Sequence, residues 1–113
     1  MMTEGARLDY VELPAAETLA SREFYRDAFG FDFTDYGPSY SSSQSGGTEL
    51  GLSADAAPAP MPGFHVTDLE AAREKVMAAG GIVERDIYAF PGGRRFEFSD
   101  PGGNRLLVFV YED

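Results

Sequence analysis

His65 is the only histidine of the 113-residue chain, and histidine is the side chain that most readily exchanges a proton near neutral pH. Together with Glu49 it could act as a general base or orient a bound molecule. The alternative, which the sequence favours, is a histidine at a strand end that bonds to the backbone or is half exposed. Glu49 would be costly to bury unpaired, so it faces solvent, pairs with Arg94, Arg95 or Arg105, or binds a cationic ligand.

The sequence lacks the residues that several other types of chemistry need. The chain has no cysteine, which excludes disulfides, thiolate metal sites and a cysteine nucleophile. Its paired glycines do not precede a helix pattern, so they do not form a phosphate-binding loop. The GGRR stretch is interpreted as a solvated hairpin corner, with Glu97 and Asp100 supplying the counter-charges.

Composition predicts one compact domain over residues 1–113, because 43% hydrophobic and 13% aromatic residues are enough to build a core. The formal net charge of −10 would repel nucleic acid; it either attracts a cationic ligand or simply keeps the protein in solution. No apolar run approaches the roughly 20 residues of a membrane span, and the N-terminus does not resemble a signal peptide. We therefore expect a cytoplasmic protein without a membrane partner.

An internal repeat predicts two modules. At an offset of 51, the fifteen residues from Glu17 align with the fifteen from Asp68 and share five identities: Ala20/Ala71, Arg22/Arg73, Glu23/Glu74, Ala28/Ala79 and Gly30/Gly81. Each segment follows a short strand pattern, continues as a helix pattern and stops at glycine before another strand. Both halves therefore contain the same strand-helix-strand unit.

The sequence also predicts where the second helix starts and ends, and which face of each helix lies on the sheet. Thr67 should cap the second helix, with Glu70 reaching back as in a capping box, and Gly80 and Gly81 should end it. The faces expected on the sheet are, for the second helix, Leu69, Ala72, Val76 and Ala79, and for the first, Ala20, Phe24 and Ala28 beside Tyr25 and Phe29.

Strand patterns complete both modules. The first strands of the modules lie at 8–13 and 63–66, and turn signals separate later strands at 31–36, 40–44, 48–53, 82–86, 95–99 and 105–111. The loops between them include 88–93. The predicted fold is α+β, with two β-α-β-β-β modules: module one at about 7–53, a linker at 54–62 rich in Ala and Pro, and module two at about 63–112.

Two such modules, with EFYRDAFGF in the first and VTDLEAAREKVMAAGG followed by FSDPGGN in the second, resemble the vicinal oxygen chelate superfamily. This superfamily includes glyoxalase I, bleomycin-resistance proteins and extradiol dioxygenases. The resemblance implies a curved mixed sheet around a ligand cleft. It also implies that catalytic members hold a divalent metal with His and Glu, which stabilises charge on substrate oxygens.

The four metal-ligand positions of the superfamily fall on Tyr10, Glu49, Met61 and Leu107. Only Glu49 keeps a ligand that suits a hard divalent cation, because a thioether and an isobutyl group cannot coordinate one. We therefore expect no metal and no other cofactor. The alternative is a metal-dependent lyase, isomerase or dioxygenase of the same superfamily, for which bound metal would be diagnostic.

If these four residues point into the cleft, strand alternation brings His65 and Phe109 to the same faces, and also Leu8, Glu12 and Arg105. The expected function is metal-free binding of a small organic molecule, cationic or aromatic, by a homodimer. Whether the chain is an enzyme is left open. A third hypothesis is a module that acts through its dimer surface alone. The expected cleft residues are Tyr10, Glu49, Met61, His65, Leu107 and Phe109.

Overall fold

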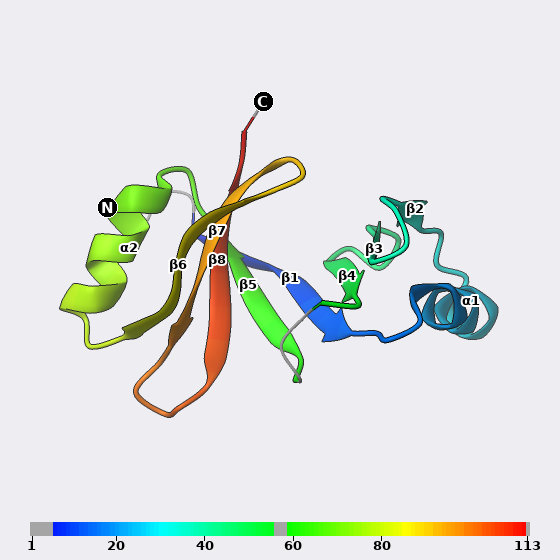
Figure 1. Ribbon diagram of the computed structural model, residues 1–113, viewed down its shortest axis with the longest axis horizontal. Helices are drawn as coiled ribbons and strands as arrows, with labels where there is room; N and C mark the ends of the chain where they lie inside the picture. Colours follow the sequence, from blue (N-terminus) through cyan, green and yellow to red (C-terminus); the bar gives the residue numbers. More distant parts are fainter. Residues whose placement is uncertain (1–5, 56–58, 113) are drawn as a thin grey trace. The chain divides into compact units, whose positions relative to one another are not determined.

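The computed structural model describes residues 6–55 and 59–112, and these contain eight strands and two helices (Figure 1). The predicted α+β fold with two β-α-β-β-β modules is confirmed. Neither described helix is long and apolar enough to cross a membrane. The elements are β1 (Arg7–Pro14), α1 (Thr18–Phe29), β2 (Thr34–Asp35), β3 (Tyr40–Ser43), β4 (Glu49–Ser53), β5 (Met61–His65), α2 (Leu69–Ala78), β6 (Ile82–Phe90), β7 (Gly93–Ser99) and β8 (Arg105–Tyr111).

The chain divides into two compact units, one with residues 9–55 and 59–61 and one with residues 6–8 and 62–112. In the first unit the strand order is β2-β3-β4-β1, and in the second it is β5-β8-β7-β6. Each unit has one parallel pair, β1 with β4 or β5 with β8, and its other pairs are antiparallel. The two halves thus share one topology. The proposed linker at 54–62 lies partly outside the described residues.

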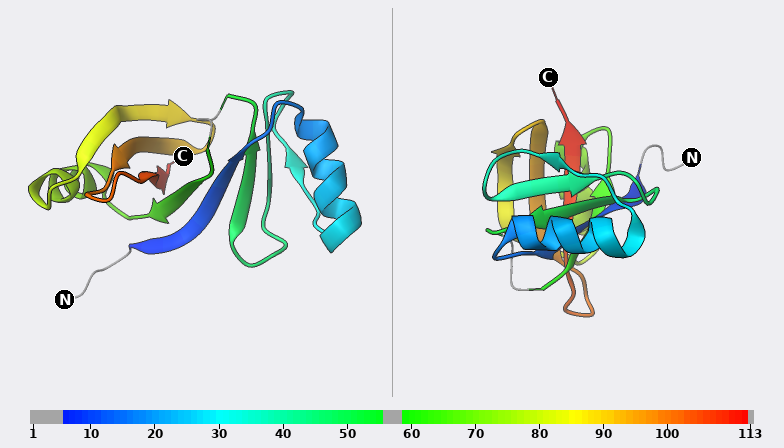
Figure 2. Two further views of the ribbon diagram at one scale, coloured as in Figure 1. Left: turned by 90° about the horizontal axis from the view of Figure 1, so that it is seen from below. Right: turned by 90° about the vertical axis from the view of Figure 1, so that its right-hand side faces the viewer.

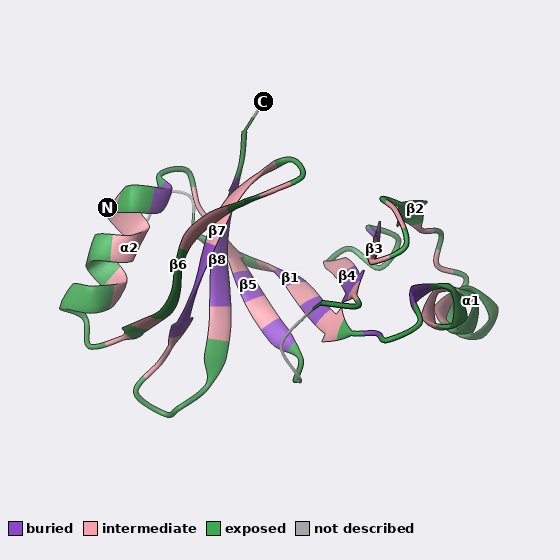
Figure 3. Ribbon diagram, viewed as in Figure 1, coloured by how far each residue is buried: buried purple, intermediate pink, exposed green. Residues whose placement is uncertain are grey.

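The core of the second unit lies between α2 and one face of its sheet (Figures 1 and 3). Alternate residues of β7 and β8 point to this face, as expected for strands. Half-buried side chains of α2, Ala72 and Val76, pack against it, so this part of the predicted helix face is confirmed. Ala79, the last residue of that predicted face, is exposed. The buried members are Leu69, Phe96, Phe98, Val108 and Val110.

The predicted inner face of α1 is wrong. Phe24 is 58% exposed, and Ala20 and Ala28 are also exposed, so most of the helix is drawn as exposed in Figure 3. The most deeply buried residue of α1 is Thr18, whose hydroxyl donates to the carbonyl of Pro38 at 3.2 Å. Spacing alone could not choose the face, because aromatic rings lie around much of this helix. Figure 2 shows α1 alongside the strands of its own unit.

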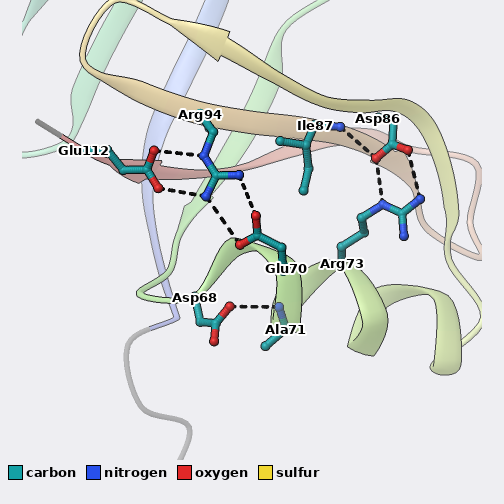
Figure 4. Close-up of polar contacts among 8 residues, drawn as sticks. All are labelled: Asp68, Glu70, Ala71, Arg73, Asp86, Ile87, Arg94 and Glu112. Carbon is teal, nitrogen blue, oxygen red and sulfur yellow. Dashed lines mark hydrogen bonds and ion pairs between the residues drawn. The ribbon is translucent and has the colours of Figure 1, made fainter.

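The start of α2 also differs from the prediction. Asp68, and not Thr67, is the N-cap, and its carboxylate accepts a hydrogen bond of 3.0 Å from the amide of Ala71 (Figure 4). Glu70 does not return to the cap, because its carboxylate accepts from Arg94 of β7 at 2.5 Å. Arg94 also donates two hydrogen bonds of 2.8 Å to Glu112. This exposed cluster joins the first turn of α2 to β7 and to the chain beyond β8.

Two strands differ in length from the prediction. The strand expected at 31–36 is reduced to Thr34–Asp35, whereas β6 continues to Phe90 through residues that were expected to be a loop. The pairing of β6 with β7 shifts register between Val83 and Arg85 and again between Arg85 and Tyr88, so β6 carries one extra residue at each place. Such bulges break the simple alternation that marks a strand in sequence.

Candidate functional site

In the first unit, Tyr10 and Glu49 are direct partners in the parallel ladder of β1 and β4, which puts their side chains on one face of the sheet. Two residues further on, Glu12 pairs with Gly51 on that face. Tyr10 and Glu12 are buried and Glu49 is half-buried. The structure therefore brings two of the predicted site residues together, and Glu12 lies on the same face, as strand alternation predicted.

A chain of hydrogen bonds connects the polar groups of this face. The Tyr10 hydroxyl donates to Glu12 Oε1 at 2.9 Å and lies 2.9 Å from the Tyr40 hydroxyl. Because Tyr10 has one hydroxyl hydrogen, Tyr40 is the donor in the second bond. Burial, and then the negative charge of Glu12, raises the pKa of Tyr10 far above its ordinary value. Tyr10 is therefore a neutral hydrogen-bond donor and does not serve as a base.

Gly51 makes this arrangement possible. A Cβ atom at Gly51 would lie 2.7 Å from the Tyr40 hydroxyl oxygen and 2.8 Å from Cζ of Tyr10, closer than real Cβ contacts. The backbone of β4 is thus bare where the two tyrosine side chains cross it. A glycine inside a strand often marks such a close approach.

In the second unit, three predicted residues share the sheet face opposite α2. His65 pairs with Phe109 in the ladder of β5 and β8, and their rings stack with centroids 4.9 Å apart. Leu107, two residues before Phe109, pairs with Gly63 and is fully buried. Arg7 lies 3.1 Å from Nδ1 of His65 through one of its guanidinium nitrogens. Met61, the first residue of β5, belongs to the other unit and is buried.

The same face holds a carboxylate surrounded by arginines, which we call the Glu97 cluster: Glu97 with Arg85, Tyr88, Arg95 and Arg105. Glu97 is 5% exposed. It accepts a hydrogen bond of 2.5 Å from the Tyr88 hydroxyl and one of 2.8 Å from Arg105, while Arg85 Nη1 lies 4.0 Å from it. Arg95 donates through Nε to the Tyr88 hydroxyl and lies 3.7 Å from Glu97.

These contacts decide the charge of the cluster. Burial alone would raise the pKa of Glu97, but the hydrogen bonds from Tyr88 and Arg105 and the positive charges of Arg95 and Arg105 outweigh it and lower that pKa. Burial, with the hydrogen bond to Glu97, raises the pKa of Tyr88 to about 12. At neutral pH the cluster therefore contains one carboxylate, a neutral phenol and three guanidinium groups.

Sequence reasoning missed Arg85 and Tyr88 of this cluster because of β6. The extra residue between Arg85 and Tyr88 puts both side chains on the Glu97 face, although three positions would separate them onto opposite faces of a regular strand. The GGRR interpretation is confirmed in part: Glu97 is a counter-charge of Arg95, whereas the partners of Arg94 were not predicted. Arg94 points to the helix side and binds Glu70 and Glu112, whereas Arg95 has a side chain that is only 15% exposed.

The residues at the four metal-ligand positions of the superfamily do not suit a divalent metal. Tyr10 keeps its proton and donates a hydrogen bond to Glu12, Met61 offers a thioether and Leu107 offers no donor atom. Of the four positions, only Glu49 has a side chain that suits such a metal. Within the described residues, no group of three His, Cys, Asp or Glu side chains could hold a metal ion. The side chains on these faces are instead suited to hydrogen bonding, ring contacts and anion contacts.

Comparison with known proteins identifies a family whose model matches most of this chain. Residues 7–108 match the family model described as the Glyoxalase/Bleomycin resistance protein/Dioxygenase superfamily. No protein of curated function matches the chain in sequence. The solved structures with the same fold share little sequence with it, so they show the fold alone.

Three of these structures illustrate how different the described proteins with this fold are. A protein described as an NAD-dependent benzaldehyde dehydrogenase from Legionella pneumophila has a TM-score of 0.79 at 18% identity, over 92% of this chain and 99% of its own. Methylmalonyl-CoA epimerase from Mycobacterium tuberculosis has a TM-score of 0.69 at 14% identity, over 100% of this chain and 94% of its own. The Mn(II)-bound glyoxalase from Novosphingobium aromaticivorans has a TM-score of 0.63 at 21% identity, over 94% of this chain and 38% of its own.

Proposed function

The chain belongs to the Glyoxalase/Bleomycin resistance protein/Dioxygenase superfamily, and from this premise we propose that it binds a small organic molecule without using a metal. The residues proposed to line the ligand site remain those expected from the sequence: Tyr10, Glu49, Met61, His65, Leu107 and Phe109. The observation that carries the proposal is the chemistry of the four family positions, where one carboxylate stands among a protonated phenol, a thioether and an isobutyl group.

The relatives support a small-molecule ligand. Solved structures of methylmalonyl-CoA epimerase with the same fold are described as complexes with methylmalonyl-CoA and with 2-nitronate-propionyl-CoA. The faces described here offer what such a site needs, namely aromatic and aliphatic surface with a few fixed polar groups. Glu49 would orient the ligand, while the aromatic rings would supply apolar contact.

Native mass spectrometry of protein purified without a chelator tests the proposal. We expect a retained organic molecule, or binding of added ones, with no stoichiometric metal. Zinc, nickel, manganese or iron at one equivalent per chain, lost on chelation together with an activity, would instead establish the metal-dependent lyase, isomerase or dioxygenase function.

A homodimer is part of the proposal. Leu19, Phe24 and Phe29 of α1 are each more than half exposed, which is a large apolar surface for one short helix. A second copy of the chain could cover this surface by a twofold contact. The cytoplasmic location stays a prediction from the sequence.

A further inference from the structure

We propose that the small molecule is an organic anion, a carboxylate attached to a flat ring, and that Arg85 and Arg105 bind its carboxylate group. This inference rests on the function proposed above and names the class of ligand. It is carried by the geometry of the Glu97 cluster.

The two arginines approach Glu97 from opposite sides. Arg85 is on β6, Glu97 on β7 and Arg105 on β8, which are adjacent strands, and Arg85 is the ladder partner of Glu97. Arg105 donates to one oxygen of the Glu97 carboxylate at 2.8 Å, and Arg85 lies 4.0 Å from the other oxygen. Glu97 is in turn fixed by Tyr88, whose hydroxyl donates to it at 2.5 Å. The buried carboxylate therefore holds both guanidinium groups in place before any ligand arrives.

Most N–H groups of the two arginines remain available. The Arg85 guanidinium stacks over the Tyr88 ring, with its central carbon 3.6 Å from the ring centroid, and stacking uses the face of the group rather than its in-plane donors. Among the described residues, Arg85 donates no hydrogen bond and Arg105 donates one, to Glu97. Their side chains are 59% and 43% exposed. A carboxylate can reach both from solvent and accept paired hydrogen bonds.

The local charge opposes the charge of the whole chain. Four of the nine basic side chains, Arg7, Arg85, Arg95 and Arg105, reach this face, although the chain has a formal net charge of −10. The acidic groups that face them are Glu97 and, at the end of the sheet, Glu84, which accepts a hydrogen bond of 2.5 Å from Ser99. The exposed guanidinium groups of Arg85 and Arg105 give this part of the face a positive charge that attracts an anion.

A second aromatic surface, besides Tyr88, lies on the same face of the sheet. Glu97 is the ladder partner of Leu107, and Phe109 is the next residue of β8 on the same face, about 7 Å further along the strand. Phe109 is only 4% exposed and stacks with the half-buried ring of His65, so His65 is the ring of this pair that a ligand can contact. A single ring bearing one carboxylate spans the distance between the arginines and this pair of rings.

Benzoate, benzamide and benzylammonium form a matched set of probes, with one ring and a negative, neutral or positive group. We expect benzoate to bind the wild-type protein at least tenfold more tightly than benzamide, with chemical-shift changes in β6, β7 and β8 in NMR titrations. Benzylammonium should bind most weakly. Raising NaCl from 50 to 500 mM should weaken benzoate binding and leave benzamide binding unchanged.

Arg85→Gln should weaken benzoate binding at least tenfold, and the Arg85→Gln, Arg105→Gln double variant further. Arg26→Gln is the matched control, because Arg26 is also 59% exposed and lies on α1. The affinity of this variant for benzoate should stay within twofold of the wild-type value. Arg85→Gln keeps the hydrogen bond between Arg105 and Glu97, so it tests the site even if the double variant does not fold. Equal binding of benzoate and benzamide, or unchanged binding by Arg85→Gln, overturns the inference.

The panel separates this inference from the proposed function. If benzylammonium or benzamide binds these faces better than benzoate does, the anion inference fails and small-molecule binding stands. In that case the cationic ligand suggested by the net charge would be restored. If no probe binds and no organic molecule is retained in native mass spectrometry, both fail.

Discussion

The hydroxyl oxygens of Tyr10 and Tyr40 lie 2.9 Å apart at the point where the two side chains cross the backbone of Gly51. The Tyr40 hydroxyl on β3 donates a hydrogen bond to Tyr10 on β1, and Tyr10 donates in turn to the buried carboxylate of Glu12. This contact depends on a strand residue without a side chain, and its stability can be tested directly.

Gly51→Ala should destabilise the fold by about 1 to 3 kcal/mol, because the new methyl group overlaps both tyrosine side chains inside a packed region. Urea unfolding measures the free energy. Gly102→Ala is the control: its backbone is not in the left-handed region and its Cβ would meet side-chain atoms of an exposed turn at 3.2 Å or more. It should change stability by no more than about 0.5 kcal/mol. Equal effects of the two substitutions would contradict the close approach.

Glu97→Gln should cost about 2 kcal/mol or more at pH 7, because three guanidinium groups lose their shared carboxylate. The pKa of Glu97 in the folded state is lowered from 4.5, so its stabilising effect is complete above that value. The effect is lost as the pH falls through the folded-state pKa, where the wild-type residue also becomes neutral. The stability difference between wild type and variant should therefore shrink with acidification, and a constant difference down to pH 2 would refute this.

Asp68→Ala should reduce the free energy of unfolding by about 1 kcal/mol, because the Ala71 amide loses its cap acceptor. Thr67→Ala serves as the comparison and should be nearly neutral, since Thr67 is exposed and precedes the cap. Hydrogen exchange of the Ala71 amide should accelerate only in the Asp68 variant. The reverse order of effects would favour the capping box that the sequence suggested.

Light scattering at micromolar concentration should give twice the mass of the chain. Phe24→Ser together with Phe29→Ser should give the monomer mass, because both rings are exposed in a single chain and should be covered in the dimer. Unchanged dimerisation in this variant would place the interface elsewhere, and a monomeric wild type would remove the dimer from the proposal.

The sequence predicted those parts of the fold in which each residue obeys one simple rule. The strand at 105–111 was placed correctly, because the DPGGN turn precedes it and apolar residues fill it. That turn is closed by Asp100, whose carboxylate accepts from the Asn104 amide at 2.9 Å. The repeat was equally informative, since two modules of one topology must leave similar patterns.

The errors occurred where two physical tendencies competed. Phe24 has the spacing of a core residue, but rings around much of α1 gave several candidate faces, and the buried position is Thr18. Thr67 and Asp68 are both good caps, and only the backbone decides between them. Within the site, Tyr10 and Glu49 were expected on one face from the family positions, and the structure adds that they are ladder partners, whereas Tyr88 could not be assigned while 88–93 was taken as a loop.

The bulge between Arg85 and Tyr88 has a consequence for comparing this chain with its relatives. Because β6 carries one extra residue there, the side chain three positions after Arg85 faces Glu97, whereas in a regular strand the side chain two positions after it would do so. In a relative with a single deletion at the bulge, the residue that supports the equivalent of Arg85 would therefore stand two positions after it. An alignment that places the gap after Tyr88 would match Tyr88 to a residue that faces the helix.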